Sequence, residues 1–67
     1  MQKYNIKLIE NFLKENNLTK TEFCKRCKIS RYSLSKIYKN DFNIDIVVII
    51  KISYAINQKP CDLFIND

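Results

Sequence analysis

Glycine is missing from this sequence of 67 residues, and proline occurs once, as Pro60. Chain reversals usually rely on these two residue types, so other residues must form them here. Asparagine, aspartate and serine stabilise turns locally, and asparagine tolerates the left-handed backbone conformation better than most residues. The positions of these polar residues therefore predict where helices begin and end.

Histidine is also absent, and there are three cysteines: Cys24, Cys27 and Cys61. A structural zinc site needs four ligands, usually Cys or His, so the Cys24 and Cys27 pair would have to recruit a carboxylate or another chain. Small buried apolar side chains explain the pair better, and we expect no metal and no cofactor. No nucleophile–base pair is evident, so an enzyme is not expected, and no small-molecule ligand is evident either.

Long apolar runs are lacking too. The longest, residues 46–50, has five residues, whereas a membrane-spanning helix needs about twenty. The start of the chain, Met1–Asn5, is polar and shows no signal-type apolar core. With an odd number of cysteines, this favours a cytoplasmic protein with reduced thiols and no membrane partner. The length predicts one domain, residues 1–67.

Apolar residues recur at three- and four-residue steps through most of the chain, which predicts an all-α fold. We expect a compact bundle of five short helices, separated by polar turns. The first ends at Asn16 and Asn17, and a turn over residues 57–60 precedes the last. The expected helices cover residues 5–16, 19–27, 31–39, 45–56 and 61–65.

Capping residues support the second, third and fourth of these helices. Thr19 and Glu22 have the spacing of a capping box, in which each side chain satisfies a free backbone N–H of the first turn. Ser30 and Asp45 are N-cap candidates for the next two helices. The sequence thus predicts two short helices joined by about three residues, which is the construction of a helix-turn-helix unit.

Positive charge is concentrated on this helix pair. The whole chain has 12 basic and 7 acidic residues, a net charge of +5. Between Leu18 and Asn40 there are seven basic residues, and the single acid is Glu22, which leaves a local excess of six charges. One sign of charge gathered on a helix pair is typical of nucleic-acid binding.

From Leu18 to Phe64 the sequence resembles the Cro/C1-type helix-turn-helix family, which is XRE-like and lambda repressor-like. Three positions depart from the pattern: Cys24 replaces a common alanine, Lys20 a glutamine, and Lys28 a frequent turn glycine. A positive φ at Lys28 would cost about 1–2 kcal/mol. The residues that carry the resemblance are Leu18, Thr19, Lys20, Phe23, Cys24, Ile29, Ser30, Leu34, Ile37, Asn40, Ile49, Ile52, Ala55, Ile56, Asp62, Leu63 and Phe64.

The resemblance implies sequence-specific binding of double-stranded DNA, by a repressor-like transcriptional regulator of bacterial or phage type. Its recognition helix, residues 31–39, would enter the major groove. The implied base contacts are Arg31, Tyr32, Ser35 and Lys36, although Tyr32 could instead pack against the preceding helix. The implied phosphate contacts are Thr19, Lys20, Ser30, Lys39 and Asn40.

The fourth helix has more apolar residues than one core stripe needs. Val47, Ile50 and Tyr54 follow helical spacing on its other side, and such a patch often marks an interface. We hypothesise a homodimer through these residues; alternatively, the N-terminal segment Met1–Tyr4 folds over them. A rival function is a protein–protein interaction module on the same fold, antitoxin-like or an anti-repressor partner.

Overall fold

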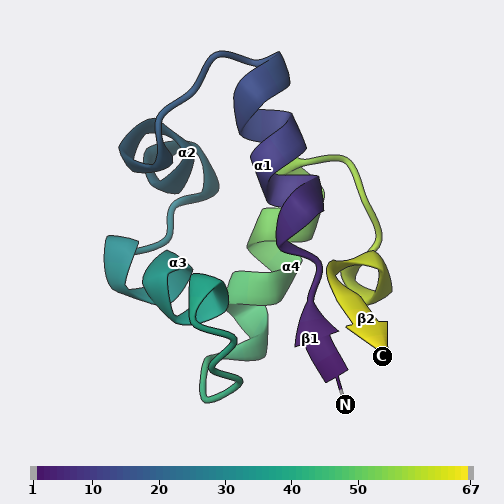
Figure 1. Ribbon diagram of the computed structural model, residues 1–67. Coiled ribbons are helices and arrows are strands. Elements are labelled where there is room, and N and C mark those ends of the chain that lie inside the picture. Colours follow the sequence, from purple (N-terminus) through teal and green to yellow (C-terminus); the bar gives the residue numbers. More distant parts are fainter. Residues whose placement is uncertain (1, 67) are drawn as a thin grey trace.

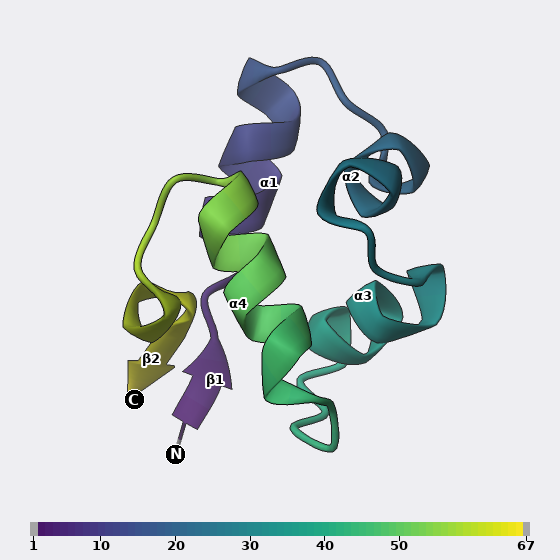
Figure 2. The same cartoon turned by 180° about the vertical axis from the view of Figure 1, so that it is seen from behind.

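The computed structural model describes residues 2–66, which form four α-helices and a two-stranded sheet (Figure 1). Helices α1 and α4 occupy the middle, with α2 and α3 on one side and the sheet on the other (Figure 1, Figure 2). In chain order the elements are β1 (Gln2–Tyr4), α1 (Ile6–Glu15), α2 (Lys20–Cys27), α3 (Arg31–Tyr38), α4 (Ile46–Ala55), a 3₁₀ helix (Pro60–Leu63) and β2 (Phe64–Asn66).

The core is built from one apolar side of every helix. Phe23 of α2 is completely buried, and its ring centroid lies 5.9 Å from that of Phe12 on α1. Leu34 on α3 and Ile52 on α4 are buried in the same cluster. An isolated helix of eight residues, the length of α2 and of α3, is unstable in water, so this shared core holds the two short helices in place.

Asparagine forms the turns, as the absence of glycine predicts. Asn17, Asn40 and Asn57 adopt φ values of 54°, 59° and 61°, and each lies just beyond the end of a helix. The short polar side chain of asparagine makes this left-handed conformation less costly than for other residues with a Cβ. Lys28, after α2, also has a positive φ of 59°, and lysine has no such advantage.

The expected fifth α-helix, residues 61–65, is wrong, whereas the mostly helical fold is as expected and also contains a small two-stranded sheet. Pro60 begins a 3₁₀ helix of four residues, which ends at Leu63, and the chain is then extended. Strand β2 pairs antiparallel with β1, with Tyr4 opposite Phe64 and Lys3 opposite Ile65. A single helical turn gains few hydrogen bonds, whereas the extended segment gains a partner strand that is remote in sequence.

Three aromatic rings attach the sheet to the end of α3. Tyr4 is 5% exposed, and its ring centroid lies 4.4 Å from that of Phe42 and 5.6 Å from that of Phe64. The Tyr4 hydroxyl donates to the carbonyl of Asp41, 3.1 Å away, and the Tyr4 N–H donates to Oδ1 of Asn40 at 2.9 Å. The N-terminal strand is therefore bonded to the turn that follows α3.

The apolar patch on α4 is open to solvent. Val47, Ile50 and Tyr54 are 45%, 49% and 87% exposed. The alternative in which the segment Met1–Tyr4 covers this patch is wrong for Gln2–Tyr4, which pair with β2 instead; Met1 lies outside the described residues. Burial of this face by a homodimer stays a prediction.

Cys24 and Cys27 are buried in the core, as small apolar side chains, while Cys61 is exposed; all three are free thiols. Burial raises the pKa of the Cys27 thiol to about 11, and the neighbouring Cys24 adds to the rise. Burial also raises the pKa of Cys24. Within residues 2–66, no helix is long and apolar enough to cross a membrane.

The left-handed turn at Lys28 gives a first prediction. Lys28→Gly removes the Cβ that makes this conformation unfavourable, a relief of about 1–2 kcal/mol. The greater freedom of glycine in the unfolded chain offsets part of this gain, so we expect a net stabilisation of about 1 kcal/mol. Thermal unfolding followed by circular dichroism measures it. Lys28→Ala removes the charge but keeps a Cβ, so an equal gain in that variant would contradict the explanation.

Burial of the thiols gives a second prediction, for alkaline pH. Because the folded-state pKa of Cys27 is raised, its contribution to stability is complete below the unfolded pKa of about 9 and is lost as pH rises toward about 11. The free energy of unfolding should therefore fall between these pH values, and less steeply in Cys27→Ala. Urea titrations across this range measure the slope. Cys61→Ala, at an exposed thiol, is the control, and equal slopes in all three proteins would refute the account.

Candidate nucleic-acid interface

Helix α2 begins with the capping box that the sequence predicts. Oγ1 of Thr19 accepts from the N–H of Glu22 at 3.2 Å, and Oε1 of Glu22 accepts from the N–H of Thr19 at 2.9 Å. Hydrogen bonds to the Glu22 carboxyl from the backbone N–H and from the side chain of Thr19 lower the pKa of this carboxyl. The Thr19 hydroxyl therefore serves the capping box with both its oxygen and its proton.

Three residues, 28–30, connect α2 to α3. The N–H of Ile29 donates to the carbonyl of Cys24 at 3.1 Å, and the left-handed Lys28 turns the chain. Ser30 then caps α3, with Oγ accepting from the N–H of Ser33 at 3.0 Å, and the two serine hydroxyls lie 3.0 Å apart. These local bonds fix the direction in which α3 leaves the turn.

The outer face of α3 carries four of the predicted DNA contacts. Ser35, Lys36 and Lys39 lie three, four and seven residues after Tyr32, which places the four on one side of the helix. Tyr32 is 70% exposed, so its alternative role in packing against α2 receives no support. Nζ of Lys36 lies 4.9 Å from the centroid of the Tyr32 ring and donates to the carbonyl of Asn43 at 2.9 Å.

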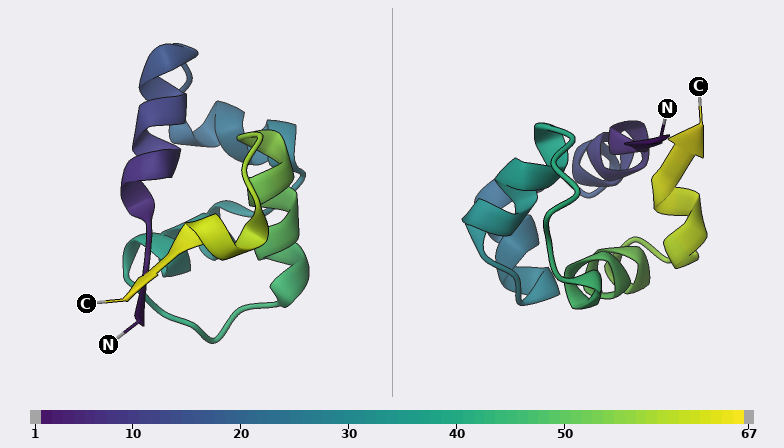
Figure 3. Two further views of the ribbon diagram at one scale, coloured as in Figure 1. Left: turned by 90° about the vertical axis from the view of Figure 1, so that its right-hand side faces the viewer. Right: turned by 90° about the horizontal axis from the view of Figure 1, so that it is seen from below.

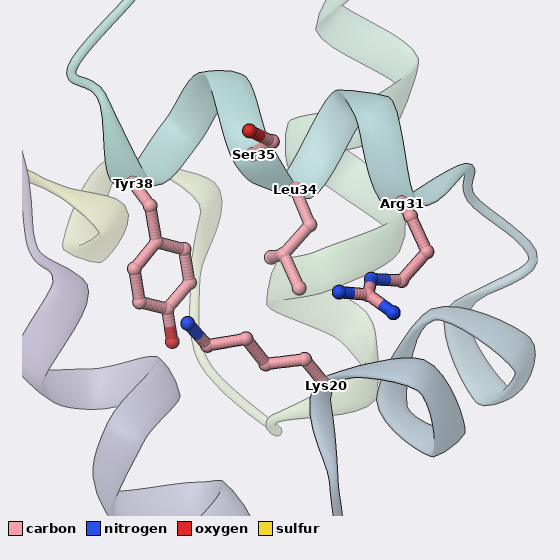
Figure 4. Close-up of a pocket in the computed structure, with 5 residues that line it drawn as sticks. All are labelled: Lys20, Arg31, Leu34, Ser35 and Tyr38. Carbon is pink, nitrogen blue, oxygen red and sulfur yellow. The ribbon is translucent and has the colours of Figure 1, made fainter.

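Arg31 is turned toward α2, away from Tyr32, Lys36 and Lys39, while Ser35, one turn later, borders the same hollow as Arg31. Figure 4 shows the Arg31 guanidinium directed toward α2, on the same side as Leu34 and Tyr38, while Ser35 points away. Nη1 of Arg31 donates to Oγ1 of Thr21 at 2.6 Å. The predicted group of base contacts is thus divided between the outer face and the α2 edge of α3. The sequence analysis missed Thr21, because a lone threonine on a helix surface gives no signal.

A small hollow of about 130 Å³ separates the start of α2 from α3 (Figure 4). Its cations are Lys20 and Arg31, and Nζ of Lys20 lies 4.0 Å from the centroid of the Tyr38 ring. The Tyr38 hydroxyl is buried and has no hydrogen-bond partner within residues 2–66. Burial raises the pKa of this hydroxyl, and the nearby Glu10 raises it further. Two cations at one opening can hold a single anionic group between them.

The remaining predicted phosphate contacts lie at the two ends of α3. Ser30 is exposed at the start, and Lys39 and Asn40 are exposed at the end. Oδ1 of Asn40 accepts from the N–H of Tyr4, so β1 holds this side chain in place. Its amide nitrogen keeps two protons for an acceptor outside the protein.

The basic residues of the helix pair do not all share one face. One group lies on α3 or next to it: Lys20, Arg31, Lys36 and Lys39. A second group borders a groove beside α4: Arg26, Lys28 and Lys51. A count of charge along the chain cannot separate these two groups, because they differ only in where the folded chain places them. Lys51 lies outside the counted segment and was missed.

This arrangement of two short capped helices, with the second exposing a basic face, defines a helix-turn-helix unit. The chain belongs to the family of Cro/C1-type HTH DNA-binding domains, whose family model matches residues 8–66. The resemblance found in the sequence is confirmed, and the chain is a DNA-binding domain of a kind used in transcription regulation. No curated protein matches the sequence.

The capping box yields a third prediction. Thr19→Ala removes the acceptor for the N–H of Glu22 and should lower the free energy of unfolding by about 1 kcal/mol. For a domain of this size that corresponds to a fall in Tm of about 4–8 °C, measured by circular dichroism. Thr19→Ser keeps the oxygen and should retain most of the stability. If serine and alanine were equally destabilising, the methyl group rather than the cap would be responsible.

Proposed function

We propose that this chain binds double-stranded DNA sequence-specifically, with α3 in the major groove, and acts as a repressor-like transcriptional regulator. The observation that carries the proposal is the outer face of α3, where Tyr32, Ser35, Lys36 and Lys39 are not buried by the rest of the chain. The major groove admits one α-helix, and side chains on its outer face then reach the base edges.

Each group of residues has a distinct role in the proposed complex. Ser35 and Lys36 lie one turn into α3 and read base edges, Lys36 by donating to guanine O6 and N7. Tyr32 contacts a thymine methyl group or a phosphate. Arg31 gives one of its five N–H donors to Thr21 and keeps the others for a guanine.

Phosphate contacts fix the register of the protein on the duplex. Lys20, with Arg31 beside it, holds a phosphate at the hollow between α2 and α3. Thr19 and Ser30 contact the backbone near the starts of α2 and α3, and Lys39 and Asn40 hold it at the other end of α3. Such contacts add affinity without sequence information.

Repression belongs to the same proposal, because a protein seated on promoter DNA excludes the polymerase from it. The predicted homodimer through Val47, Ile50 and Tyr54 is not needed for this proposal. A dimer would read two half-sites about one helical turn apart, and a monomer would read one.

Selection from a random pool of duplexes, followed by gel-shift titration, tests the proposal. Arg31→Ala should relax the preference at one base position and cost about 1–3 kcal/mol of binding free energy. Lys39→Ala should weaken binding to all sequences alike and reduce the slope of log K against log salt by about 0.9. Lys7→Ala, at an exposed lysine of α1, is the matched control.

Two results would overturn the proposal. A changed sequence preference in Lys39→Ala would contradict its assignment to phosphate. If the wild-type chain enriched no sequence and bound no duplex at low salt, the protein–protein interaction module would become the better explanation.

A further inference from the structure

A second surface, away from the outer face of α3, combines apolar and basic groups. It is a groove of about 300 Å³ between the end of α2 and the outer side of α4. Figure 2 shows the molecule from the side on which α4 lies in front, with α2 next to it. The lining residues are Arg26, Cys27, Lys28, Ile50, Lys51, Tyr54 and Ala55.

The floor of this groove is apolar and open to water. Ile50 is 49% exposed and Tyr54 is 87% exposed, although both are large side chains that gain free energy when buried. Tyrosine is among the residues that contribute most to protein–protein contacts, because its ring is large and its hydroxyl keeps a polar contact. The groove therefore offers room for an apolar side chain from outside.

Among residues 2–66, three cations and no carboxylate border the groove. Nζ of Lys51 donates to the carbonyl of Lys28 at 3.2 Å, which holds the lysine across the groove. Arg26 is close enough to Glu22, one turn earlier on α2, to lower its pKa, but no ion pair forms for any of the three cations within residues 2–66. Apart from the interaction of Arg26 with Glu22, the positive charge of this group is not neutralised by residues 2–66 and is open to an external ligand.

The charge around the groove selects among possible occupants. A second copy of this chain, seated symmetrically, would bring Arg26, Lys28 and Lys51 against the same cations, and like charges at an interface are costly. A DNA backbone would satisfy the cations but would leave Ile50 and Tyr54 against phosphate and water. A segment with an apolar anchor and acidic neighbours satisfies both parts of the surface.

We propose that this groove binds an acidic segment of a partner protein, which inserts an apolar side chain between Ile50 and Tyr54 and pairs its carboxylates with Arg26, Lys28 and Lys51. Because the groove lies beside α4, the segment can bind while the outer face of α3 holds DNA. The site thus gives the regulator a docking surface for a second protein on its operator.

An acetylated peptide with two central leucines, flanked on each side by two glutamates, is the probe. It is titrated into the ¹⁵N-labelled full chain, and amide shifts are followed by NMR at low salt. Shifts should cluster at residues 26–28 and 50–55. A peptide with glutamines in place of glutamates tests the charge, and one with alanines in place of leucines tests the anchor; both should bind at least about fivefold more weakly.

Variants of the chain separate the two halves of the surface. Tyr54→Ser, at a side chain that is 87% exposed, should weaken the peptide about fivefold or more and leave the affinity for a duplex with one half-site unchanged. Lys28→Asn with Lys51→Gln removes two charges, while asparagine still suits the left-handed turn, and should weaken the peptide by a similar factor. Lys7→Gln with Lys14→Gln, at two exposed lysines of α1, also removes two charges and is the charge-matched control, which should bind as the wild type does.

Three outcomes would overturn the proposal. Shifts spread over the outer face of α3 would mean that the peptide is held by general positive charge. Concentration-dependent shifts at Ile50 and Tyr54 without peptide, with a sedimentation mass of two chains, would assign the surface to a homodimer. No shifts at millimolar peptide would leave the groove without the proposed ligand, and DNA binding by the same sample would show that the proposed function stands independently.

Discussion

The exposed basic side of α3 exists because its opposite side is buried. Helices α2 and α3 have eight residues each, too few to be stable alone, and their positions depend on packing of Phe23, Leu34 and Ile37 in the common core. The caps at Thr19 and Ser30 then set where each helix starts. With the inner side of α3 fixed in this way, the outer residues are held at a constant spacing, which is what recognition of a DNA groove requires.

Local signals in the sequence predicted most of the helical part. Thr19 and Glu22 form a capping box whose members are three residues apart, so its geometry follows from the spacing alone. The stops at Asn17 and Asn40 follow in the same way from the backbone preference of asparagine. The sheet could not be predicted, because β1 and β2 are three residues each and are stabilised by pairing between opposite ends of the chain.

The sequence predicts which residues belong to the candidate site, but not how their side chains are arranged in space. Arg31 and Tyr32 are neighbours in the chain, yet adjacent residues on a helix point about 100° apart, and the hydrogen bond to Thr21 draws Arg31 toward α2. In the same way, a count of charges along residues 18–40 cannot show that Lys51 comes to lie beside Lys28. Both features depend on how helices pack, which is settled by tertiary contacts rather than by local pattern.

The sheet has a consequence for how the molecule can be handled and extended. Gln2 lies opposite Asn66, so the first and the last described residues lie at the same end of the two-stranded sheet, as Figure 3 shows. Tyr4 connects the sheet by hydrogen bonds to Asn40 and Asp41, just beyond α3. A label or a fused protein at either end would therefore be attached close to the last turn of α3, and an insertion in the loop between α1 and α2 would keep a greater distance from this end of the sheet.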